Sequence, residues 1–182
     1  MFLSDEDILT IFKDENRKSY AFDQLVRKYQ QKVYWTVRRM VIDHEDANDI
    51  TQDIFIKVWN KLSNFRGEAR LYTWIYRIAI NDTLNFLNSR KRKLFIPLVS
   101  VEKTLEEEIE SSEYFSGDEI QVKLQKAILQ LPEKQRIVFN LRYYDELSYE
   151  EMSAVLKTSV GALKASYHHA VRKLEKILFE ND

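Results

Sequence analysis

Apolar residues recur at steps of three and four along most of the chain, the spacing that gives a helix one apolar face. The first run follows Ser4-Asp-Glu-Asp, which is typical of a helix start because serine caps the first turn and acids favour its dipole. A longer run from Phe22 to Val41 predicts a second amphipathic helix. Its outward residues predict a solvated basic face and include Arg27, Lys28, Arg38 and Arg39.

A third helix, predicted from about residue 46 to residue 63 after a start at Asp43, carries two apolar lines. A helix of a small bundle normally buries one line, so the second predicts either central burial or a surface that a partner covers. Asp49, Gln52 and Asp53 border it, either as dipole-favourable acids and a solvated amide or as the polar rim of a protein-binding surface. The first line comprises Ala47, Ile50, Ile54 and Val58, and the second comprises Phe55, Trp59 and Leu62.

Residues 64–93 begin as a loop around Gly67 and continue as a helix from about Leu71. A stripe of amides on this helix can hydrogen-bond base edges, the cations that follow can lie along phosphates, and nearby aromatic rings can stack on unpaired bases. A core helix whose cations complement its dipole is the alternative, and the pattern by itself leaves both interpretations open. The apolar face comprises Leu71, Ile75, Ile78, Ala79 and Phe86, the stripe Arg77, Asn81, Asn85 and Asn88, the cations Arg90 to Lys93, and the aromatic residues Phe65, Tyr72, Trp74 and Tyr76.

Residues 94–118 contain Pro97, Gly117 and a run of glutamates, which predicts a linker that is at least partly disordered. Helical periodicity resumes near residue 120 and predicts a second domain. Its first helix face comprises Ile120, Leu124, Ala127, Ile128 and Leu131.

The second domain ends in a pattern typical of a helix-turn-helix. Ser148-Tyr-Glu-Glu is a capping box that opens a short helix, and Ser159 caps a longer last helix. A short helix, a turn and a longer helix with a cationic outer face favour a DNA-binding unit over an ordinary αα-hairpin, which is the alternative. The inner face of the last helix is predicted from Leu163, Tyr167, Ala170, Leu174 and Leu178, and the outer face from Lys164, Ala165, His168, His169 and Arg172.

Composition restricts both fold and chemistry. With three Gly and two Pro in 182 residues, long helices are favoured over a turn-rich β fold. The chain has no cysteine and three histidines, so neither a disulfide framework nor a Cys- or His-based metal site is expected. The N-terminus is acidic and no apolar run approaches the roughly 20 residues of a membrane span, so a cytoplasmic protein without membrane insertion is expected.

The net charge of −1 conceals a segregation of charge along the chain. Residues 1–93 carry 17 Lys and Arg against 13 Asp and Glu, residues 94–119 carry 1 against 8, and residues 120–182 carry 10 against 8. Two mildly basic blocks therefore flank an acidic segment and can present basic faces.

Five motifs, in order, carry a resemblance to a known family. They are Asp49-Ile-Thr-Gln-Asp-Ile-Phe-Ile-Lys-Val-Trp59, Asn64-Phe-Arg-Gly-Glu68, Tyr72-Thr-Trp-Ile-Tyr-Arg-Ile-Ala-Ile-Asn81, Leu131-Pro-Glu-Lys-Gln-Arg136 and Leu147-Ser-Tyr-Glu-Glu151. Over about residues 20–93 and 120–178 the chain resembles the extracytoplasmic-function (ECF) sigma factors of bacterial RNA polymerase. The resemblance implies an all-α fold, with sigma region two in residues 1–93, an acidic flexible linker in residues 94–119 and sigma region four in residues 120–182.

The resemblance also implies roles for individual residues. A surface on the third helix binds the clamp helices of core polymerase, a loop and the helix after it capture and open the −10 promoter element, and the last helix recognises the −35 element. The implied polymerase-binding residues are Asp49, Gln52, Asp53, Phe55 and Trp59; those for the −10 element are Phe65, Arg66, Gly67, Glu68, Trp74, Arg77, Asn81, Asn85, Arg90 and Arg92; and those for the −35 element are Lys164, Ser166, His168, His169 and Arg172.

The last helix departs from the family pattern. Ser166 and His169 stand where many members carry Arg, and Ala162-Leu163 stands where members often carry Thr-Val. Lys164 lacks the guanidinium fork that contacts guanine through two hydrogen bonds, and the two histidines are neutral near pH 7. Weaker −35 contacts, or contacts that depend more on DNA shape, are therefore expected.

The resulting hypothesis is a promoter-specificity subunit that catalyses no reaction, needs no cofactor or metal, and has an anti-sigma factor as a further partner. A dimeric helix-turn-helix regulator is the alternative, although the sequence contains no obvious dimerisation helix. Co-purification with RNA polymerase would favour the first, and tight palindromic DNA binding the second. A hydrolytic enzyme is disfavoured because no nucleophile–base pair, glycine-rich phosphate loop or metal spacing is visible.

Overall fold

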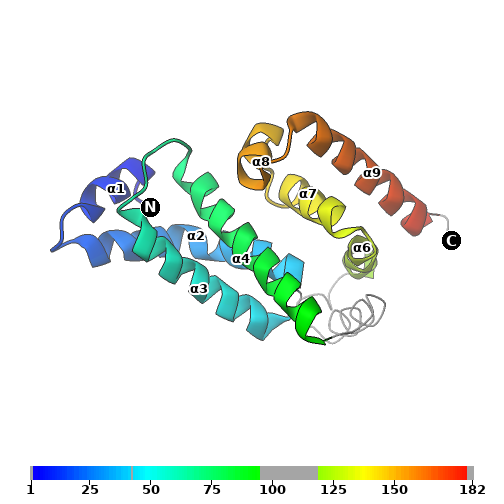
Figure 1. Ribbon diagram of the computed structural model, residues 1–182, viewed down its shortest axis with the longest axis horizontal. Coiled ribbons are helices and arrows are strands. Elements are labelled where there is room, and N and C mark those ends of the chain that lie inside the picture. Colours follow the sequence, from blue (N-terminus) through cyan, green and yellow to red (C-terminus); the bar gives the residue numbers. More distant parts are fainter. Residues whose placement is uncertain (1, 42, 95–118, 180–182) are drawn as a thin grey trace.

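The structure, a computed structural model, describes residues 2–41, 43–94 and 119–179, and within them all regular secondary structure is α-helical (Figure 1). The predicted all-α fold is confirmed, and none of the described helices has the length and apolarity needed to cross a membrane. Most of the predicted linker lies outside the described residues. The N-terminal group consists of α1 (Asp5–Phe12), α2 (Lys18–Val41), α3 (His44–Leu62) and α4 (Leu71–Leu94), and the C-terminal group of α6 (Glu119–Leu129), α7 (Glu133–Tyr143), α8 (Tyr149–Leu156) and α9 (Val160–Phe179).

Side-chain caps fix where four of these helices begin. Ser4 and Asp43 each accept a hydrogen bond from the backbone N–H three residues later, at 3.0 and 2.7 Å, at the starts of α1 and α3. Ser148 and Glu151 form the predicted capping box of α8. Ser159 Oγ accepts a hydrogen bond of 3.3 Å from the first turn of α9. The predicted helix starts are confirmed, because each depends on residues within one turn of the chain.

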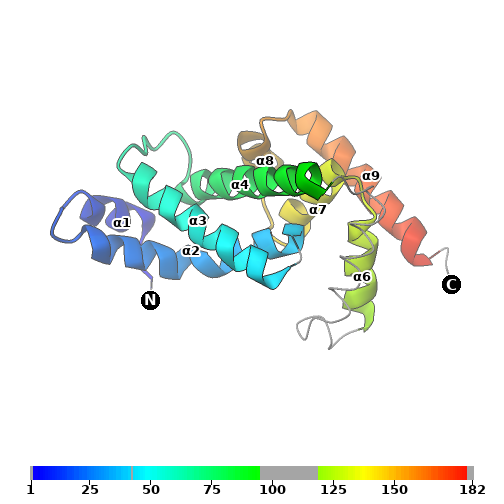
Figure 2. The same ribbon diagram turned by 60° about the horizontal axis from the view of Figure 1, so that its bottom comes forward.

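Helix α4 is the central element of the N-terminal group. It packs against α2 and α3 on one side and against α8 of the C-terminal group on the other (Figures 1 and 2). Leu71, Ile75 and Ala79 are buried, as predicted, whereas Asn81 and Asn85 are exposed. The amide stripe is therefore on the surface rather than in the core.

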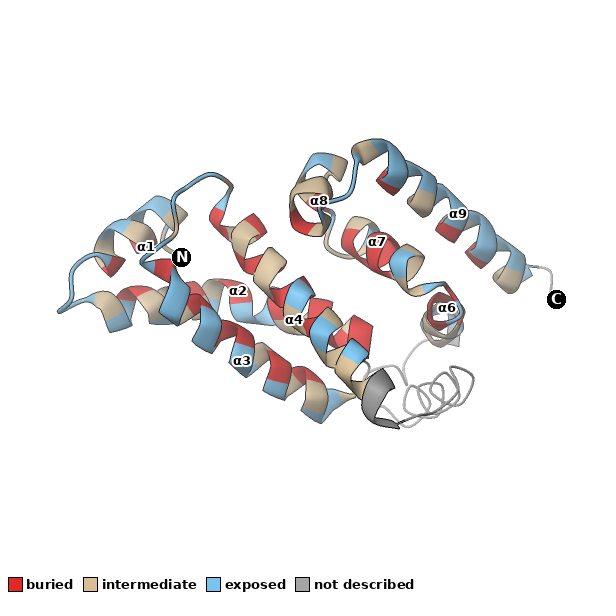
Figure 3. Cartoon of the chain, in the orientation of Figure 1, coloured by how far each residue is buried: buried red, intermediate tan, exposed pale blue. Residues whose placement is uncertain are grey.

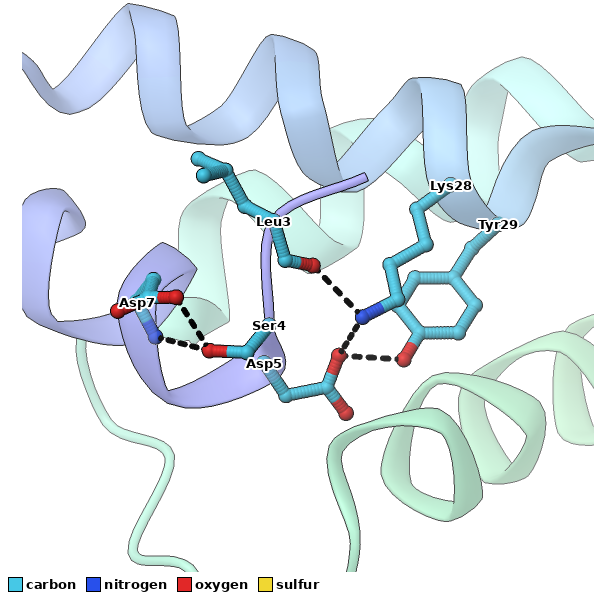
Figure 4. A network of polar contacts seen from close by, with 6 residues as sticks. All are labelled: Leu3, Ser4, Asp5, Asp7, Lys28 and Tyr29. Carbon is cyan, nitrogen blue, oxygen red and sulfur yellow. Dashed lines mark hydrogen bonds and ion pairs between the residues drawn. The ribbon is translucent and has the colours of Figure 1, made fainter. Parts of the chain in front are cut away.

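Helix α1 is fastened to α2 by a small polar network beside its N-terminal cap (Figure 4). Lys28 Nζ donates to the Leu3 carbonyl at 2.9 Å and to Asp5 Oδ1 at 2.7 Å, and Tyr29 Oη donates to the same carboxylate oxygen at 2.7 Å. Burial, together with this hydrogen bond to Asp5, raises the pKa of Tyr29. Lys28 is therefore a structural contact between α1 and α2 rather than part of a solvated face.

The predicted basic face of α2 is wrong for its C-terminal half as well. Arg38 is only 5% exposed, and Arg39 forms an ion pair of 3.3 Å with Asp145. Helix α2 packs against α1, α3, α4 and α7, so little of its C-terminal half faces water. These positions were predicted to face outward because the period of a single helix does not reveal how many other helices pack around it.

The C-terminal group has its own small core, in which Phe139, Ala170 and Leu174 are buried. Ile120 was predicted on the inner face of α6, but it is 75% exposed. The contact of α6 with α9 uses Leu124 and Ala127 instead, so the first turn of α6 extends beyond the core.

The two groups also share a larger core. Leu147, Met152 and Leu163 of the C-terminal group belong to the same cluster of buried apolar residues as Leu71 and Ile75 of α4. The sequence left the relative placement of the two groups open. In the structure they pack directly against each other, with α8 beside α4 (Figures 1 and 2).

Candidate nucleic-acid and protein interfaces

A groove of about 470 Å³ runs between α2 and α3. Ile56 is its most exposed apolar residue, with 58% of its surface accessible, and Gln52 lies on the same wall. Asp49 and Asp53 are exposed on the same helix. An accessible apolar side chain with charged and amide neighbours is the composition of a protein-binding surface. The groove is lined by Phe22, Val26, Gln30, Thr51, Gln52, Phe55, Ile56 and Trp59.

The second apolar line of α3 belongs mostly to the core. Phe55 is 8% exposed and Leu62 is buried, so central burial is the correct alternative for both. Trp59 is half-buried, and its ring meets those of Phe12 and Phe22 edge-on at centroid distances of 5.5 and 4.9 Å. Trp59 therefore supports the wall of the groove and also holds α1 and α2 against α3.

Three α2 residues of the groove were not among the predicted site residues. Phe22, Val26 and Gln30 follow one another at four-residue steps, and Phe22 and Val26 belong to the apolar run that predicted this helix. The amide of Gln30, at the same four-residue spacing, is the feature of the sequence that indicates this side of the helix is accessible. A second, more polar groove of about 460 Å³ shares Gln30, Thr51 and Gln52 with the first, so the surface continues along α2 and α3.

The loop before α4 has the shape that its glycine permits. Gly67 has a φ of 74°, in the region that favours glycine, and Arg66 and Glu68 are exposed on either side of it. The half-buried rings of Phe65 and Trp74 lie 5.3 Å apart, so the loop rests on the first turn of α4. This arrangement brings the loop and the aromatic start of α4 into one surface.

The predicted DNA face of α4 is only partly free. Asn81 and Asn85 are exposed, but Arg90 Nη1 forms an ion pair of 3.0 Å with Asp46 of α3. Burial and the neighbouring Asp43 raise the pKa of Asp46 in spite of Arg90. Arg77 is half-buried, and its Nε has no hydrogen-bond partner among the described residues. The side chain of Arg92 lies outside the described residues.

Two of the predicted stacking surfaces are occupied by contacts within the chain. Tyr76 is 3% exposed, and burial followed by the charge of Asp145 raises its pKa, so the prediction that it stacks on bases is wrong. Tyr72 Oη donates to the Glu151 carboxylate in α8. The C-terminal group covers this side of α4, which the period of α4 alone does not reveal. Phe65 and Trp74 are the predicted aromatic residues that keep ring surface near the loop.

Helix α9 presents its predicted outer face to solvent (Figure 3). Lys164, His168, His169 and Arg172 are exposed and Ser166 is half-buried. Lys164 Nζ lies 5.6 Å from the centre of the Tyr149 ring at the start of α8, so the two helices meet as a helix-turn-helix unit requires.

Two family models match the chain: Sigma-70 region 2 over residues 25–93, and Sigma-70, region 4 over residues 121–174. The RNA polymerase sigma-H factor of Pseudomonas aeruginosa is 35% identical, over 98% of this chain and 96% of that protein. The ECF RNA polymerase sigma-E factor of Escherichia coli is 34% identical, over 82% of each chain.

Solved structures share the fold. The sigma factor RpoE of Bartonella quintana, in complex with the anti-sigma factor NepR, is 20% identical with a TM-score of 0.67, over 86% of this chain and 96% of that one. CnrH, in complex with the cytosolic domain of CnrY, is 23% identical with a TM-score of 0.69, over 98% of this chain and 99% of that one. The chain belongs to the ECF sigma factors, and it is an RNA polymerase sigma factor that directs transcription to specific promoters.

Proposed function

We propose that three surfaces share the work of this sigma factor. The α2–α3 groove binds the clamp helices of core RNA polymerase, the loop at residues 65–68 and α4 capture and open the −10 element, and α9 contacts the −35 element. The main support is that one helical bundle carries two separate surfaces, an apolar groove on α2 and α3 and exposed amides on α4. No residue that lines the groove belongs to α4. Polymerase and DNA can then be bound at the same time. In this proposal residues 1–93 bind polymerase and the −10 element, residues 120–182 bind the −35 element, and residues 94–119 link the two regions.

Ile56 is the apolar anchor for polymerase, with Asp49, Gln52 and Asp53 as its polar rim. A side chain that is exposed in the free protein becomes buried on binding, so its truncation weakens the complex without disturbing the core. Phe55 and Trp59 contribute to this site by shaping the groove.

Opening of the −10 element is driven by binding energy and not by a catalytic group. Extruding a base costs a few kcal/mol, and stacking on an aromatic ring returns about 1–3 kcal/mol per base. Phe65 and Trp74 offer ring surface at the loop, and Asn81 and Asn85 offer amides to base edges. Because these terms nearly balance, the protein opens DNA only together with polymerase. It acts in the cytoplasm and is itself no enzyme.

The −35 element is bound through Lys164, Ser166, His168, His169 and Arg172 of α9. With only Lys164 and Arg172 as permanent cations, this face makes fewer phosphate contacts than an arginine-rich helix would. Recognition there depends correspondingly more on the shape of the DNA.

An anti-sigma factor controls access to these surfaces. The structural relatives RpoE and CnrH are described in complex with NepR and CnrY, and NepR is described as an anti-sigma factor. An equivalent partner of this chain would cover the α2–α3 groove and so prevent polymerase from binding.

Transcription from a cognate promoter, reconstituted with purified core polymerase, tests the proposal. We expect weak duplex binding by the isolated protein and open complexes only when both proteins are present. The same transcript from core polymerase alone, or tight binding of a palindromic operator by a purified dimer, would contradict it.

A further inference from the structure

A cavity of about 820 Å³ lies beside α2, between the start of α4 and the turn that joins α7 to α8. Pockets that bind small molecules usually measure roughly 300–1,000 Å³, whereas cores contain few voids larger than a water molecule. The cavity shares no residue with the α2–α3 groove, with the loop at residues 65–68 or with the outer face of α9. Neither polymerase binding nor promoter binding, as proposed above, therefore accounts for it.

Aromatic rings form much of the cavity wall. The polar ends of two of them are already bound within the protein, because Tyr29 Oη donates to Asp5 at 2.7 Å and Tyr72 Oη donates to Glu151. Burial is the largest cause that raises the pKa of Tyr29, Tyr72 and Tyr76, so these hydroxyls stay neutral and do not repel an anion. The flat ring surfaces are left for a planar ligand. The aromatic lining residues are Phe2, Tyr29, Trp35, Tyr72, Tyr76 and Tyr144.

One face of α2 brings positive charge to the same cavity. Lys28, Lys32, Trp35 and Arg39 follow one another at steps of four, three and four residues, which places them on one side of the helix. Lys32 is exposed, and its Nζ forms no ion pair or hydrogen bond within the part of the chain that the structure describes. Lys28 uses two of its three N–H donors in the polar network beside α1 (Figure 4). The charge on this face is therefore only partly neutralised by the protein itself.

The turn on the other side of the cavity carries hydrogen-bond acceptors. Asp145 is held by Thr36 Oγ1, which donates to it at 2.9 Å, and by Arg39 Nη1 at 3.3 Å. Glu146 is exposed, and it also lines the cavity. A carboxylate accepts hydrogen bonds from hydroxyl and amino groups, so this wall suits the polar groups of a ligand rather than its anion.

We propose that the cavity is a binding site for a nucleoside phosphate. The base stacks on the rings of Trp35 and Tyr72, the phosphate groups bind Lys28 and Lys32, and a hydroxyl or amino group donates to Glu146. A ligand of this class combines a planar ring with an anion, as the rings and the cations of the cavity require. The site adds a function to those proposed above and depends on none of the three surfaces.

Isothermal titration calorimetry of the 182-residue chain tests the site, with ADP, GDP, CDP and UDP as probes. We expect saturable binding of at least one of these nucleotides. The matching nucleoside and inorganic diphosphate should each bind roughly tenfold more weakly or worse, because one contacts only the rings and the other only the cations. Absence of saturable binding by all four nucleotides would overturn the proposal. Inorganic diphosphate that binds as tightly as the nucleotide would also overturn it.

Two substitutions separate the contribution of charge from that of stacking. Lys32→Ala removes an exposed cation, and Trp35→Leu replaces a flat ring by an aliphatic side chain. Each should weaken nucleotide binding roughly tenfold, and thermal melting checks that each variant is folded. Lys61→Ala, at an exposed lysine of α3 outside the cavity, is the control. Wild-type affinity in Lys32→Ala, or an equal loss in Lys61→Ala, would contradict the assignment.

Photochemical cross-linking locates the bound nucleotide. An azido derivative of the base should label peptides that contain Trp35, Tyr72 or Tyr144, and an excess of the unmodified nucleotide should suppress the labelling. Label confined to α9, or to the exposed amides of α4, would assign binding to the DNA surfaces and overturn the proposal.

Discussion

Lys157 occupies the left-handed region of backbone angles, with a φ of 52°, where α8 ends and the turn to α9 begins. A side chain there costs free energy that glycine avoids, so we expect Lys157→Gly to raise the free energy of unfolding by about 0.5–1 kcal/mol. Urea denaturation measures the change. Lys157→Ala removes the same charge but keeps a Cβ, so an equal gain from alanine would show that backbone strain is not the cause.

His169 tests how weakly α9 contacts phosphates. It is exposed on the outer face and carries no permanent charge, so His169→Arg adds a permanent cation. The slope of log affinity against log salt for a −35 duplex should steepen by about 0.9, the value for one more neutralised phosphate. Fluorescence anisotropy over a salt series measures it. His169→Gln should leave the slope unchanged, and an unchanged slope in the arginine variant would remove His169 from the DNA face.

Helix α3 carries both an exposed apolar residue, Ile56, and a packed one, Trp59, which test the proposed polymerase site differently. Ile56→Ala should weaken polymerase binding at least tenfold, about 1.4 kcal/mol, without lowering the melting temperature, because the side chain is exposed in the free protein. Trp59 is a poorer probe because its ring packs on Phe12 and Phe22, so its truncation also destabilises the bundle. A pull-down titration with core polymerase measures the affinity, with Lys61→Ala on the same helix as control. Wild-type affinity in Ile56→Ala would place the interface elsewhere.

Helix α4 should lose only its promoter function when its amides are removed. Asn81→Ala is expected to weaken opening of the −10 element by about 1–3 kcal/mol and to leave polymerase affinity unchanged, since Asn81 lies outside the α2–α3 groove. Permanganate reactivity of unpaired thymines measures opening, and Asn16→Ala in the exposed α1–α2 turn is the control. If Asn81→Ala and Ile56→Ala show the same defect, the proposed separation of surfaces is wrong.

At the scale of the whole molecule, Asp145 should make the closed state, in which the two helical groups pack against each other, depend on pH. Burial outweighs Arg39 and Thr36 and raises the pKa of Asp145 from 3.8 to about 6. A group with a higher pKa in the closed state stabilises that state fully below pH 3.8 and loses this contribution as pH rises through about 6. The free energy of separating the groups should therefore fall by up to about 3 kcal/mol as pH rises across this window.

Energy transfer between dyes on Asn60→Cys in α3 and Glu175→Cys in α9, both exposed positions, measures how the closed state depends on pH. Transfer efficiency should decrease between about pH 4 and about pH 6, and Asp145→Asn should flatten the profile. Lys32 and Arg39 of α2 and Tyr76 of α4 also act electrostatically on or with Asp145, and burial raises the pKa of Tyr76 so that it stays neutral throughout. An unchanged profile in Asp145→Asn would assign the effect to another group.

The helices and their surface faces followed from local pattern. Caps at Ser4, Asp43 and Ser148 act within one turn, so the predicted starts are confirmed, and the outer face of α9 is exposed as predicted. The predictions failed where a helix that is distant in the sequence packs against the predicted surface. Tyr76 is buried rather than free to stack, and Arg38 is buried rather than solvated.

The sequence by itself determined the helices and the family, because periodicity, caps and motifs are properties of neighbouring residues. Tertiary structure decided which apolar line of α3 remains accessible, and it placed Asp145 beside Arg39 and Glu151 beside Tyr72. Those pairs join residues about a hundred or eighty positions apart, so only the packing of one helical group on the other creates them. Burial and charge pairing at that junction are the physical basis of the closed state.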